Sequence, residues 1–328
     1  MSSDGMTNHT GSPTEAACCV PRRAVGHRQS PERTVEQRPT GGHAIRQAIV
    51  RAGGFLMGDS TGDHNRGDGE TPVHEVQLDE YSIDTTNVTN EQFAFFVSDT
   101  SYRTEAEIFG FSAVFQLAVQ TDRSNLMDPP AATPWWLGVR GADWHQPGGP
   151  GSGIEGLEQH PVVHISWNDA VAYCRWAGRR LPTEAEWERA ARGGLEGASY
   201  PWGDDLFEPG SDNWRCNIWQ GSFPVTNTKD DGWLLTAPVE TYEPNGFGLW
   251  QSVGNVWEWC ADWYDPDYYA TSPKSAPTGP AKGQLRVLRG GSYLCHDSYC
   301  NRYRNSARSS NTPDSSMGNA GFRTVALD

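Results

Sequence analysis

Hydrophobic and polar residues follow strand-like patterns in the first ordered part of the chain. A short apolar run extends from Ile49 to Met57 and contains two glycines. The next stretch, from Val73 to Leu78, alternates between apolar and polar residues. Alternation with a period of two is typical of strands that bury one face. We therefore expect strands in both stretches.

Three later segments carry the start signals of helices. In each of them a hydroxyl side chain can cap the first turn, and in two of them a Gln or Glu three positions later completes a capping box. Glycines mark two of the helix ends, because glycine readily adopts the left-handed conformation. The expected helices are one after Thr89, one from Asn168 to Ala177 between Ser166 and Gly178, and one that follows Thr183 and closes at Gly193.

Regular patterns become rare beyond Tyr200. The 328 residues include 36 Gly, 22 Pro and 14 Trp, a composition that suits turns and short strands around a core of indoles. No linker long enough to separate a second folding unit interrupts this part. We expect one irregular, loop-rich α+β domain over residues 46–328. Residues 1–45 lack apolar periodicity and are expected to form a disordered tail.

The charge of the chain narrows the classes of partner. A net charge of -15 and an isoelectric point near 5.0 disfavour nucleic acid and anionic membranes, which would repel this surface. No apolar run approaches the length of a membrane span, and the start lacks a secretory signal pattern. Seven cysteines at uneven spacing favour reduced thiols over a disulfide framework. We expect a cytoplasmic monomer.

One pair of cysteines, Cys295 and Cys300, stands five residues apart after Gly290 and Gly291. Two thiolates suit Cu(I), which prefers sulfur and accepts few ligands. A structural zinc ion would need four ligands, and no second Cys/His pair at finger-like spacing exists. The spacing alone leaves two other interpretations open, a disulfide and a pair of buried small hydrophobic residues.

The sequence around this pair resembles that of the formylglycine-generating enzymes, also called sulfatase-modifying factors, over roughly the last 280 residues. Most of the matching motifs belong to the whole superfamily and support the fold more than the activity. The segment that follows the cysteines is similar to that of the enzymes proper. The superfamily motifs are Gly53-Gly54-Phe55-Leu56-Met57-Gly58, Arg180-Leu181-Pro182-Thr183-Glu184-Ala185-Glu186-Trp187-Glu188, Gly254-Asn255-Val256-Trp257-Glu258-Trp259 and Gly321-Phe322-Arg323. The enzyme-like segment comprises Asn301-Arg302-Tyr303-Arg304, Ala307-Arg308-Ser309 and Asn311-Thr312-Pro313-Asp314-Ser315-Ser316.

The resemblance implies a loop-rich fold related to C-type lectins and a copper-dependent oxidase. Such an enzyme uses O2 and a thiol reductant to convert the cysteine of a Cys-x-Pro-x-Arg motif in unfolded sulfatases to formylglycine. Cys295 and Cys300 would hold Cu(I), and the client thiol would join them as a third sulfur ligand. Ser292 and Tyr299 match family residues beside the metal, with ordinary backbone bonding as the alternative for Ser292. Residues expected at the client groove or close to the site are Trp135, Trp136, Trp257, His296 and Asn319.

The resemblance also implies structural calcium, which prefers many oxygen ligands. One implied site uses the side chains of Asn217 and Asp231 and the carbonyls of Ile218 and Trp233. In the second implied site, a Gln stands where the family pattern has Asn, which puts that ion in question. The residues of the second site are Gln251, Gly254, Val256 and Glu258.

Three arginines after the cysteine pair are expected to have structural roles, held by carboxylates and carbonyls, since a guanidinium bonds several acceptors at once. They are Arg302, Arg304 and Arg308. Relatives that are secreted carry cysteines where this chain has Ala191, Asn305 and Thr324. Cys174 thereby loses its partner, which agrees with a reducing compartment.

Three other activities share parts of this pattern. A non-catalytic module of the superfamily would bind peptide or glycan. An iron-dependent sulfoxide synthase would need a His-rich metal motif, which this sequence lacks. A thiol oxidoreductase that uses a Cys295/Cys300 disulfide would stay active after copper chelation. A separate hypothesis concerns the segment Cys19-Val20-Pro21-Arg22-Arg23, which fits Cys-x-Pro-x-Arg. Either this match arises by chance, or the segment acts as a substrate or as a competing ligand.

Overall fold

Two four-stranded sheets form the framework of the computed structural model, which describes residues 21, 42–207, 210 and 212–327. The first sheet has the order β1-β4-β14-β7, with antiparallel pairs throughout. Its strands are β1 (Gln47–Val50), β4 (Tyr81–Asp84), β14 (Val325–Ala326) and β7 (Arg179–Arg180). The end of the domain is therefore paired with its beginning.

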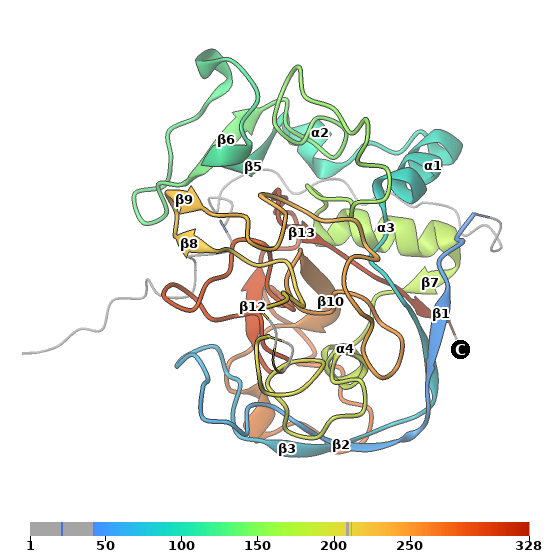
Figure 1. Ribbon diagram of the computed structural model, residues 1–328. Coiled ribbons are helices and arrows are strands. Elements are labelled where there is room, and N and C mark those ends of the chain that lie inside the picture. The colour runs from blue at the N-terminus through green and yellow to red at the C-terminus, as the bar shows by residue number, and fades with distance from the viewer. Residues whose placement is uncertain (1–20, 22–41, 208–209, 211, 328) are drawn as a thin grey trace, which may run out of the picture.

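The second sheet has the order β12-β11-β10-β13 and lies at the centre of the molecule (Figure 1). β10 and β13 run parallel, and the other two pairs are antiparallel. Its strands are β12 (Arg308–Asn311), β11 (Arg286–Arg289), β10 (Trp257–Trp263) and β13 (Ala320–Gly321). The motif segments around Trp257, Arg289 and Gly321 thus meet side by side in one sheet.

Three antiparallel hairpins complete the strands. The pairs β2–β3 and β5–β6 lie on opposite sides of the molecule, with the central sheet between them (Figure 1). The hairpin strands are β2 (Gly53–Met57), β3 (His74–Leu78), β5 (Phe111–Phe115), β6 (Trp136–Arg140), β8 (Gly221–Ser222) and β9 (Thr226–Asn227). The strands expected before residue 80 are confirmed as β1, β2 and β3.

The three expected helices are present, and each begins at the expected cap with a complete capping box. Their N-caps are Thr89, Ser166 and Thr183. A fourth helix, which Thr104 caps in the same way, was not expected from the sequence. The helices are α1 (Asn90–Thr100), α2 (Glu105–Phe109), α3 (Trp167–Ala177) and α4 (Glu184–Ala191), and short 3-10 turns are η2 (Gln116–Ala118), η3 (Arg123–Asn125) and η4 (Tyr268–Ala270).

Indoles fill the interior, as the composition predicts. Five tryptophans have at most 1% of their surface exposed. They lie in three of the hydrophobic clusters that hold the irregular loops together. These residues are Trp136, Trp187, Trp219, Trp257 and Trp259. The structure confirms an α+β, loop-rich architecture.

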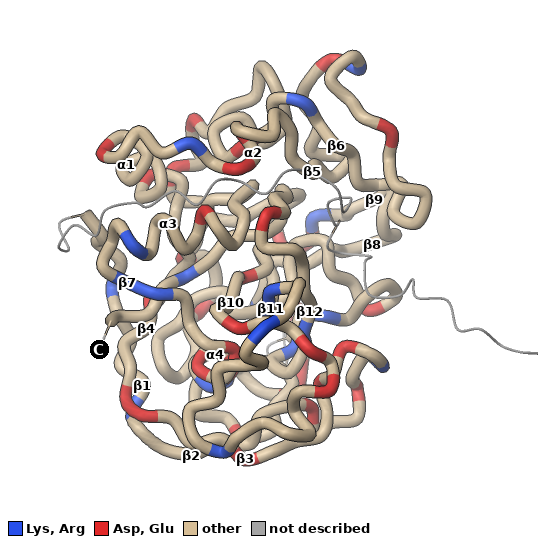
Figure 2. Tube along the Cα trace, turned by 180° about the vertical axis from the view of Figure 1, so that it is seen from behind, with Lys and Arg blue, Asp and Glu red and all other residues tan. Residues whose placement is uncertain are grey.

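Buried ion pairs connect the loops to one another. They confirm the structural role expected for Arg302, Arg304 and Arg308. Arg304 donates two hydrogen bonds to Glu70, at 2.7 and 2.9 Å. Arg302 pairs with Asp68, and Arg308 reaches Glu184 at 2.6 and 2.9 Å. Basic and acidic residues accordingly lie next to one another around α4, β10 and β11 (Figure 2). The loop between β2 and β3 is thereby tied to the segment that follows the two cysteines.

The boundary expected at residue 45 is slightly too late. His43 bonds to Asp84 at 2.9 Å and to Tyr173 at 3.0 Å, and Ile45 belongs to the core. The predicted disorder concerns residues 1–45. Of these, the structure describes only Pro21 and residues 42–45. Among the residues that are described, no helix is long and apolar enough to cross a membrane.

Candidate functional site

Cys295 and Cys300 stand at the two ends of one compact turn. The N–H of Cys300 donates to the carbonyl of His296 at 2.9 Å, and the N–H of Cys295 donates to the carbonyl of Ser292 at 2.9 Å. The turn therefore coils the chain back instead of extending it between the two thiols. Both side chains are buried in the main hydrophobic cluster, at 0% and 3% exposed, and both are thiols.

Ser292 and Asn319 meet beside Cys295. The side-chain N–H of Asn319 donates to the hydroxyl of Ser292 at 2.9 Å, and both residues are fully buried. The backbone N–H of Ser292 points at the sulfur of Cys295, at 3.4 Å. The structure thus brings together three of the site residues that the family pattern singles out.

Aromatic rings surround Tyr299, the residue before Cys300. Its ring stacks on Phe223, with centroids 4.2 Å apart, and meets the edge of Trp135 at 5.3 Å. Trp136 is fully buried in the hydrophobic cluster that also contains Leu294. These contacts build an apolar wall on one side of the cysteine turn, which keeps water away from groups behind it.

Two further residues of the expected site are placed differently. Trp257 lies in the main core with no exposed surface, so its position favours packing over contact with a peptide. His296 has a partly exposed side chain that bonds to Ser298 at 2.7 Å and to Asp297 at 2.9 Å. Its carbonyl, rather than its ring, organises the cysteine turn.

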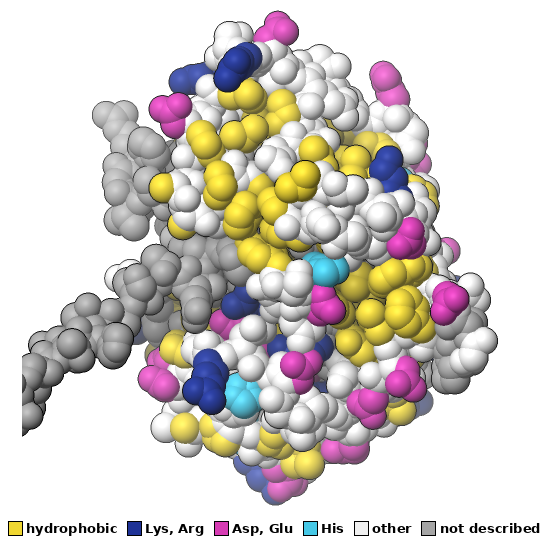
Figure 3. All heavy atoms as spheres, turned by 60° about the vertical axis from the view of Figure 1, so that its left-hand side comes forward, with side chains coloured by type: hydrophobic (Ala, Val, Ile, Leu, Met, Phe, Trp, Pro, Cys, Tyr) yellow, Lys and Arg dark blue, Asp and Glu magenta, His cyan; other side chains and the backbone are white. Residues whose placement is uncertain are grey.

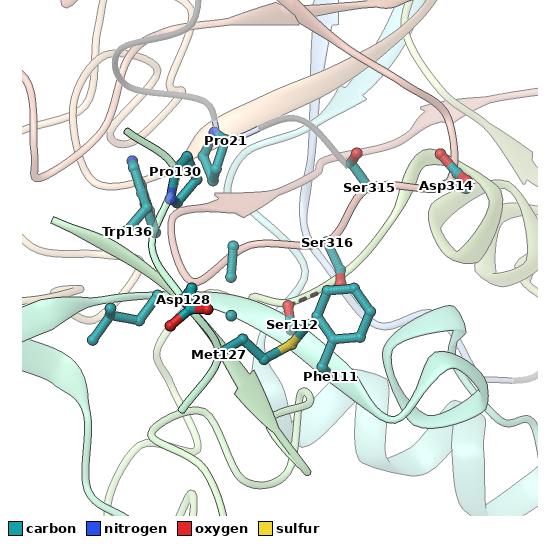
Figure 4. A pocket seen from close by; sticks show the side chains of 13 residues that line it. Pro21, Phe111, Ser112, Met127, Asp128, Pro130, Trp136, Asp314, Ser315 and Ser316 are labelled. Carbon is teal, nitrogen blue, oxygen red and sulfur yellow. Dashed lines mark hydrogen bonds between the residues drawn. The ribbon is translucent and has the colours of Figure 1, made fainter. Parts of the chain in front are cut away.

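A pocket of about 230 Å³ opens between the β5–β6 hairpin and the segment after β12 (Figure 4). Its lining comprises Pro21, Phe111, Ser112, Ala113, Met127, Asp128, Pro130, Trp136, Leu137, Gly138, Asp314, Ser315 and Ser316. Trp136 of this lining belongs to the same hydrophobic cluster as Leu294, the residue before Cys295. Hydrophobic side chains also gather in patches on the molecular face shown in Figure 3.

Asn311 is the polar group of this region that sequence reasoning missed as a contact residue. It is fully buried at the end of β12, and its side-chain N–H donates to the carbonyl of Pro21 at 3.0 Å. A buried amide that bonds a backbone carbonyl can hold an extended peptide without reading its side chains. The signal in the sequence was its place in the enzyme-like segment, whose last part begins with Asn311-Thr312-Pro313.

The donors at the cysteine turn fit a soft ion of low coordination number. Within the described part of the chain, no group of three or more His, Cys, Asp or Glu side chains could hold a metal, so a four-ligand zinc site is not formed there. Two buried thiols suit Cu(I). Burial raises the pKa of the thiols of Cys174, Cys216 and Cys260, which makes these three unreactive core residues.

The first implied calcium position offers a buried oxygen without a protein donor. The side-chain N–H groups of Asn217 donate to Leu235 and Asn255, whereas its Oδ1 is buried and accepts nothing. The carboxylate of Asp231 lies close by, held by the N–H of Trp233 at 2.9 Å and by that of Ile218. Burial raises the pKa of Asp231, as expected for a carboxylate that lacks a nearby cation. This donor set fits Ca2+.

The second implied position fits calcium less well. Glu258 already accepts hydrogen bonds from Trp187 at 2.7 Å and from two nitrogens of Arg323 at 2.7 Å. Its negative charge is therefore compensated. Gln251 contributes a buried Oε1 without a donor, and Gly254 packs closely against the backbone of Asn217. The arrangement around Glu258 is an ion pair rather than a ready cation site.

Comparisons with known proteins agree on one family. Residues 31–327 match the model of the "Sulfatase-modifying factor enzyme 1-like domain". A formylglycine-generating enzyme of Streptomyces coelicolor is 61% identical over 277 residues, which cover 84% of this chain and 88% of that protein. An "Inactive C-alpha-formylglycine-generating enzyme 2" of Bos taurus is 44% identical over 289 residues, with 87% and 89% covered. In structure, PvdO from Pseudomonas aeruginosa superposes with a TM-score of 0.64 at 21% identity over 91% of this chain and 99% of that one, which supports the fold.

Proposed function

Because this chain belongs to the sulfatase-modifying factor family, we propose that it converts the cysteine of a Cys-x-Pro-x-Arg segment in unfolded sulfatases to formylglycine. The observation that carries the proposal is the pair Cys295 and Cys300, two buried thiols at the ends of one compact turn. Two thiols held in this way support the proposal of a soft-metal site.

The reaction needs a redox partner, because no acid or base side chain can replace a C–S bond by a C=O bond. The client CH2–SH group, O2 and two reductant thiols would give an aldehyde, hydrogen sulfide, water and one disulfide. Oxidation takes the client carbon to the thioaldehyde level, and hydrolysis then releases hydrogen sulfide, so the aldehyde oxygen comes from water and O2 is reduced to water. Cu(I) bound by Cys295 and Cys300 would supply the oxygen chemistry when present.

The chain's own residues would position the client and protect the site. Asn311 would bind the client backbone. The N–H of Ser292 donates to the sulfur of Cys295, and Asn319 fixes the Ser292 hydroxyl. The rings of Trp135, Phe223 and Tyr299 would exclude water from the oxidant. Orientation and water exclusion are the contributions that a protein makes to such chemistry.

The test uses the copper-loaded protein, air, a thiol reductant and a synthetic Cys-x-Pro-x-Arg peptide. Mass spectrometry should detect the aldehyde product. Cys295→Ala and Cys300→Ala should each abolish the product and lower the copper stoichiometry. Cys174→Ala is the matched control, because Cys174 is a buried thiol of the same core cluster. An active Cys295→Ala or Cys300→Ala protein would refute the proposal.

The second candidate is a non-catalytic module that binds peptide or glycan. It is supported by the 44% identical relative that has "Inactive" in its name. This candidate predicts a chain that binds the peptide, holds no copper and yields no aldehyde. A copper-independent thiol oxidoreductase predicts activity that survives a Cu(I) chelator. One assay with and without chelator separates the three.

Two further proposals concern ions and compartment. We propose one structural Ca2+ at Asn217, Ile218, Asp231 and Trp233, supported by the buried acceptor of Asn217. A reducing compartment such as the cytoplasm is supported by the thiols of Cys174, Cys216 and Cys260. Measuring calcium retained after dialysis, and locating the native protein by fractionation, would test these two proposals.

A further inference from the structure

Three stretches of the chain without a charged side chain meet near the cysteine turn. Residues 108–121, 129–139 and 216–228 contain no Lys, Arg, Asp, Glu or His, although charged residues make up 20% of the sequence. The first two stretches supply β5 and nearly all of β6, and the third carries the β8–β9 hairpin. Figure 1 shows the two hairpins on the same side of the molecule.

Direct contacts join the three stretches. The backbone N–H of Gln116 donates to the carbonyl of Trp135 at 2.8 Å, and its side-chain amide donates to the carbonyl of Pro224 at 2.9 Å. The ring of Phe223 lies nearly at right angles to that of Trp135, with centroids 5.4 Å apart. The uncharged stretches are therefore neighbours in the fold, although they are far apart in the sequence.

Large apolar side chains of these stretches are open to solvent. Val225, at the tip of the β8–β9 hairpin, is 71% exposed, and Leu117 is 43% exposed. Together with the half-buried Trp135, Phe223 and Pro224, they form what we call the uncharged surface. Figure 3, in which the left-hand side of Figure 1 comes forward, shows hydrophobic side chains gathered on the upper part of that face. Exposed apolar side chains with few charges among them are typical of surfaces that bind partners.

The uncharged surface continues into the cysteine turn. Phe223 stacks on Tyr299 of this turn, with centroids 4.2 Å apart, and Trp135 meets the same ring at 5.3 Å. The N–H of Trp219, two residues before β8, donates to the carbonyl of Cys295 at 3.0 Å. A polypeptide whose cysteine reaches this turn would therefore bring its flanking residues to the uncharged surface.

We propose that the uncharged surface binds apolar residues that flank the Cys-x-Pro-x-Arg motif in an unfolded client; this rests on the proposed function. An apolar side chain leaves water on this surface without desolvating a charge. A folded protein buries most of its large apolar residues, whereas an unfolded chain presents them along its length. The surface would thus select clients by their folding state, in addition to the motif that reaches the cysteines.

The test uses two fluorescent peptides with the same Ser-x-Pro-x-Arg core, in which serine replaces the client cysteine. Leu and Val flank the core in one peptide, and the same number of Gly and Ser residues flank it in the other. Anisotropy measures the affinity of both peptides for the full-length parent and for three variants. The variants are Leu117→Ser/Val225→Ser, the conservative Leu117→Met/Val225→Ile, and Ile49→Ser. Ile49 is the control, because it is 56% exposed in β1, outside the uncharged surface.

The parent and Ile49→Ser should bind the apolar-flanked peptide several-fold more tightly than the other peptide. The double serine variant should lose this preference, and the conservative double variant should keep it, which a general effect on folding would not produce. Equal affinities for the two peptides in the parent would overturn the inference. A preference that survives both serine substitutions would overturn it as well.

Two further measurements separate the remaining outcomes. Sedimentation velocity compares the parent with the double serine variant: a dimeric parent and a monomeric variant would assign the surface to a second copy of this chain and overturn the inference. Aldehyde formation by the parent tests the proposed function on its own. A parent that prefers the apolar flanks but makes no aldehyde would refute the proposed function, and the surface would then bind unfolded chains that are not clients.

Discussion

At the scale of single residues, Asn217 combines a satisfied amide nitrogen with a buried oxygen that accepts no hydrogen bond. A buried acceptor without a partner costs about 1–3 kcal/mol. The carboxylate of Asp231 adds negative charge close by, because it accepts a hydrogen bond from the N–H of Ile218, the residue after Asn217. A bound cation would remove this cost, which is why Asn217 is the residue through which a calcium effect should be visible.

We predict that Ca2+ raises the thermal unfolding midpoint of the parent protein and that Asn217→Ala loses most of this response. At a calcium concentration about 100 times Kd, binding adds about 2.7 kcal/mol to the free energy of unfolding. Calorimetry with calcium or with a chelator measures the difference. Asn227→Ala, in the nearby strand β9, should respond like the parent. A calcium response that survives in Asn217→Ala would assign the ion to another place.

At the scale of elements, Glu184 joins a helix to a sheet. It is the first residue of α4, and its carboxylate bonds to Arg289 of β11 at 2.7 Å and to Arg308 of β12 at 2.6 and 2.9 Å. Burial would raise the pKa of Glu184, but the charges of Arg308 and Arg289 lower it to about 2. The carboxylate therefore stays ionised and keeps both arginines compensated.

We predict that Glu184→Gln destabilises the protein by about 3–5 kcal/mol, because the buried guanidinium of Arg308 loses its carboxylate and that of Arg289 keeps only Glu188. Chemical denaturation measures the change. Glu80→Gln is the control, since the Arg51–Glu80 pair is exposed and such pairs contribute at most about 1 kcal/mol. Equal losses in the two variants would contradict the structural role given to Glu184.

How far the sequence predicts these elements depends on how local their signals are. The caps at Thr89, Ser166 and Thr183 are local, and the structure confirms them. Thr104 carries the same capping box, but its helix has only five residues, too few to show an apolar period. The place of β14 between β4 and β7 depends on partners more than 140 positions away, and no local pattern encodes that.

The candidate site divides in the same way. The thiols of Cys295 and Cys300 are visible in the sequence because they stand within one short segment. The pocket is not, because the β5–β6 hairpin and the segment after β12 meet only in the fold. Asn311 is quoted in a family motif, yet its contact with Pro21 across 290 positions has no local signature. The position of Trp257 in the core likewise emerges only from packing.

At the scale of the whole molecule, the interior holds many ionisable groups, and not all of them are paired. Asp262 is buried, and its carboxylate accepts a hydrogen bond from the N–H of Glu184 at 2.8 Å. Burial, with repulsion from the Glu184 charge, raises the pKa of Asp262 to about 8. The guanidinium groups of Arg289 and Arg308 donate to Glu184. Asp262 therefore stays protonated at neutral pH. The stability of the molecule should therefore depend on pH.

The sign of this dependence follows from proton binding. Between pH 4 and 8, folded Asp262 keeps a proton that the unfolded chain releases, so the free energy of unfolding falls as pH rises through this range. The contribution is fully present below the unfolded pKa and is lost as pH approaches 8. We predict that Asp262→Asn, which keeps an acceptor for the N–H of Glu184 but cannot ionise, removes this part of the decline. Its advantage over the parent should grow from pH 5 to pH 8 by on the order of a few kcal/mol.

Urea denaturation at both pH values measures this double difference, in which the other titrating groups cancel. Asp79→Asn, an exposed position, is the control and should change with pH as the parent does. If Asp262→Asn and the parent lose stability in parallel between pH 5 and pH 8, the proton assigned to Asp262 is not there. The carboxylate would then be ionised in the folded protein, and a cation near Glu184 other than Arg289 and Arg308 would be required to hold it.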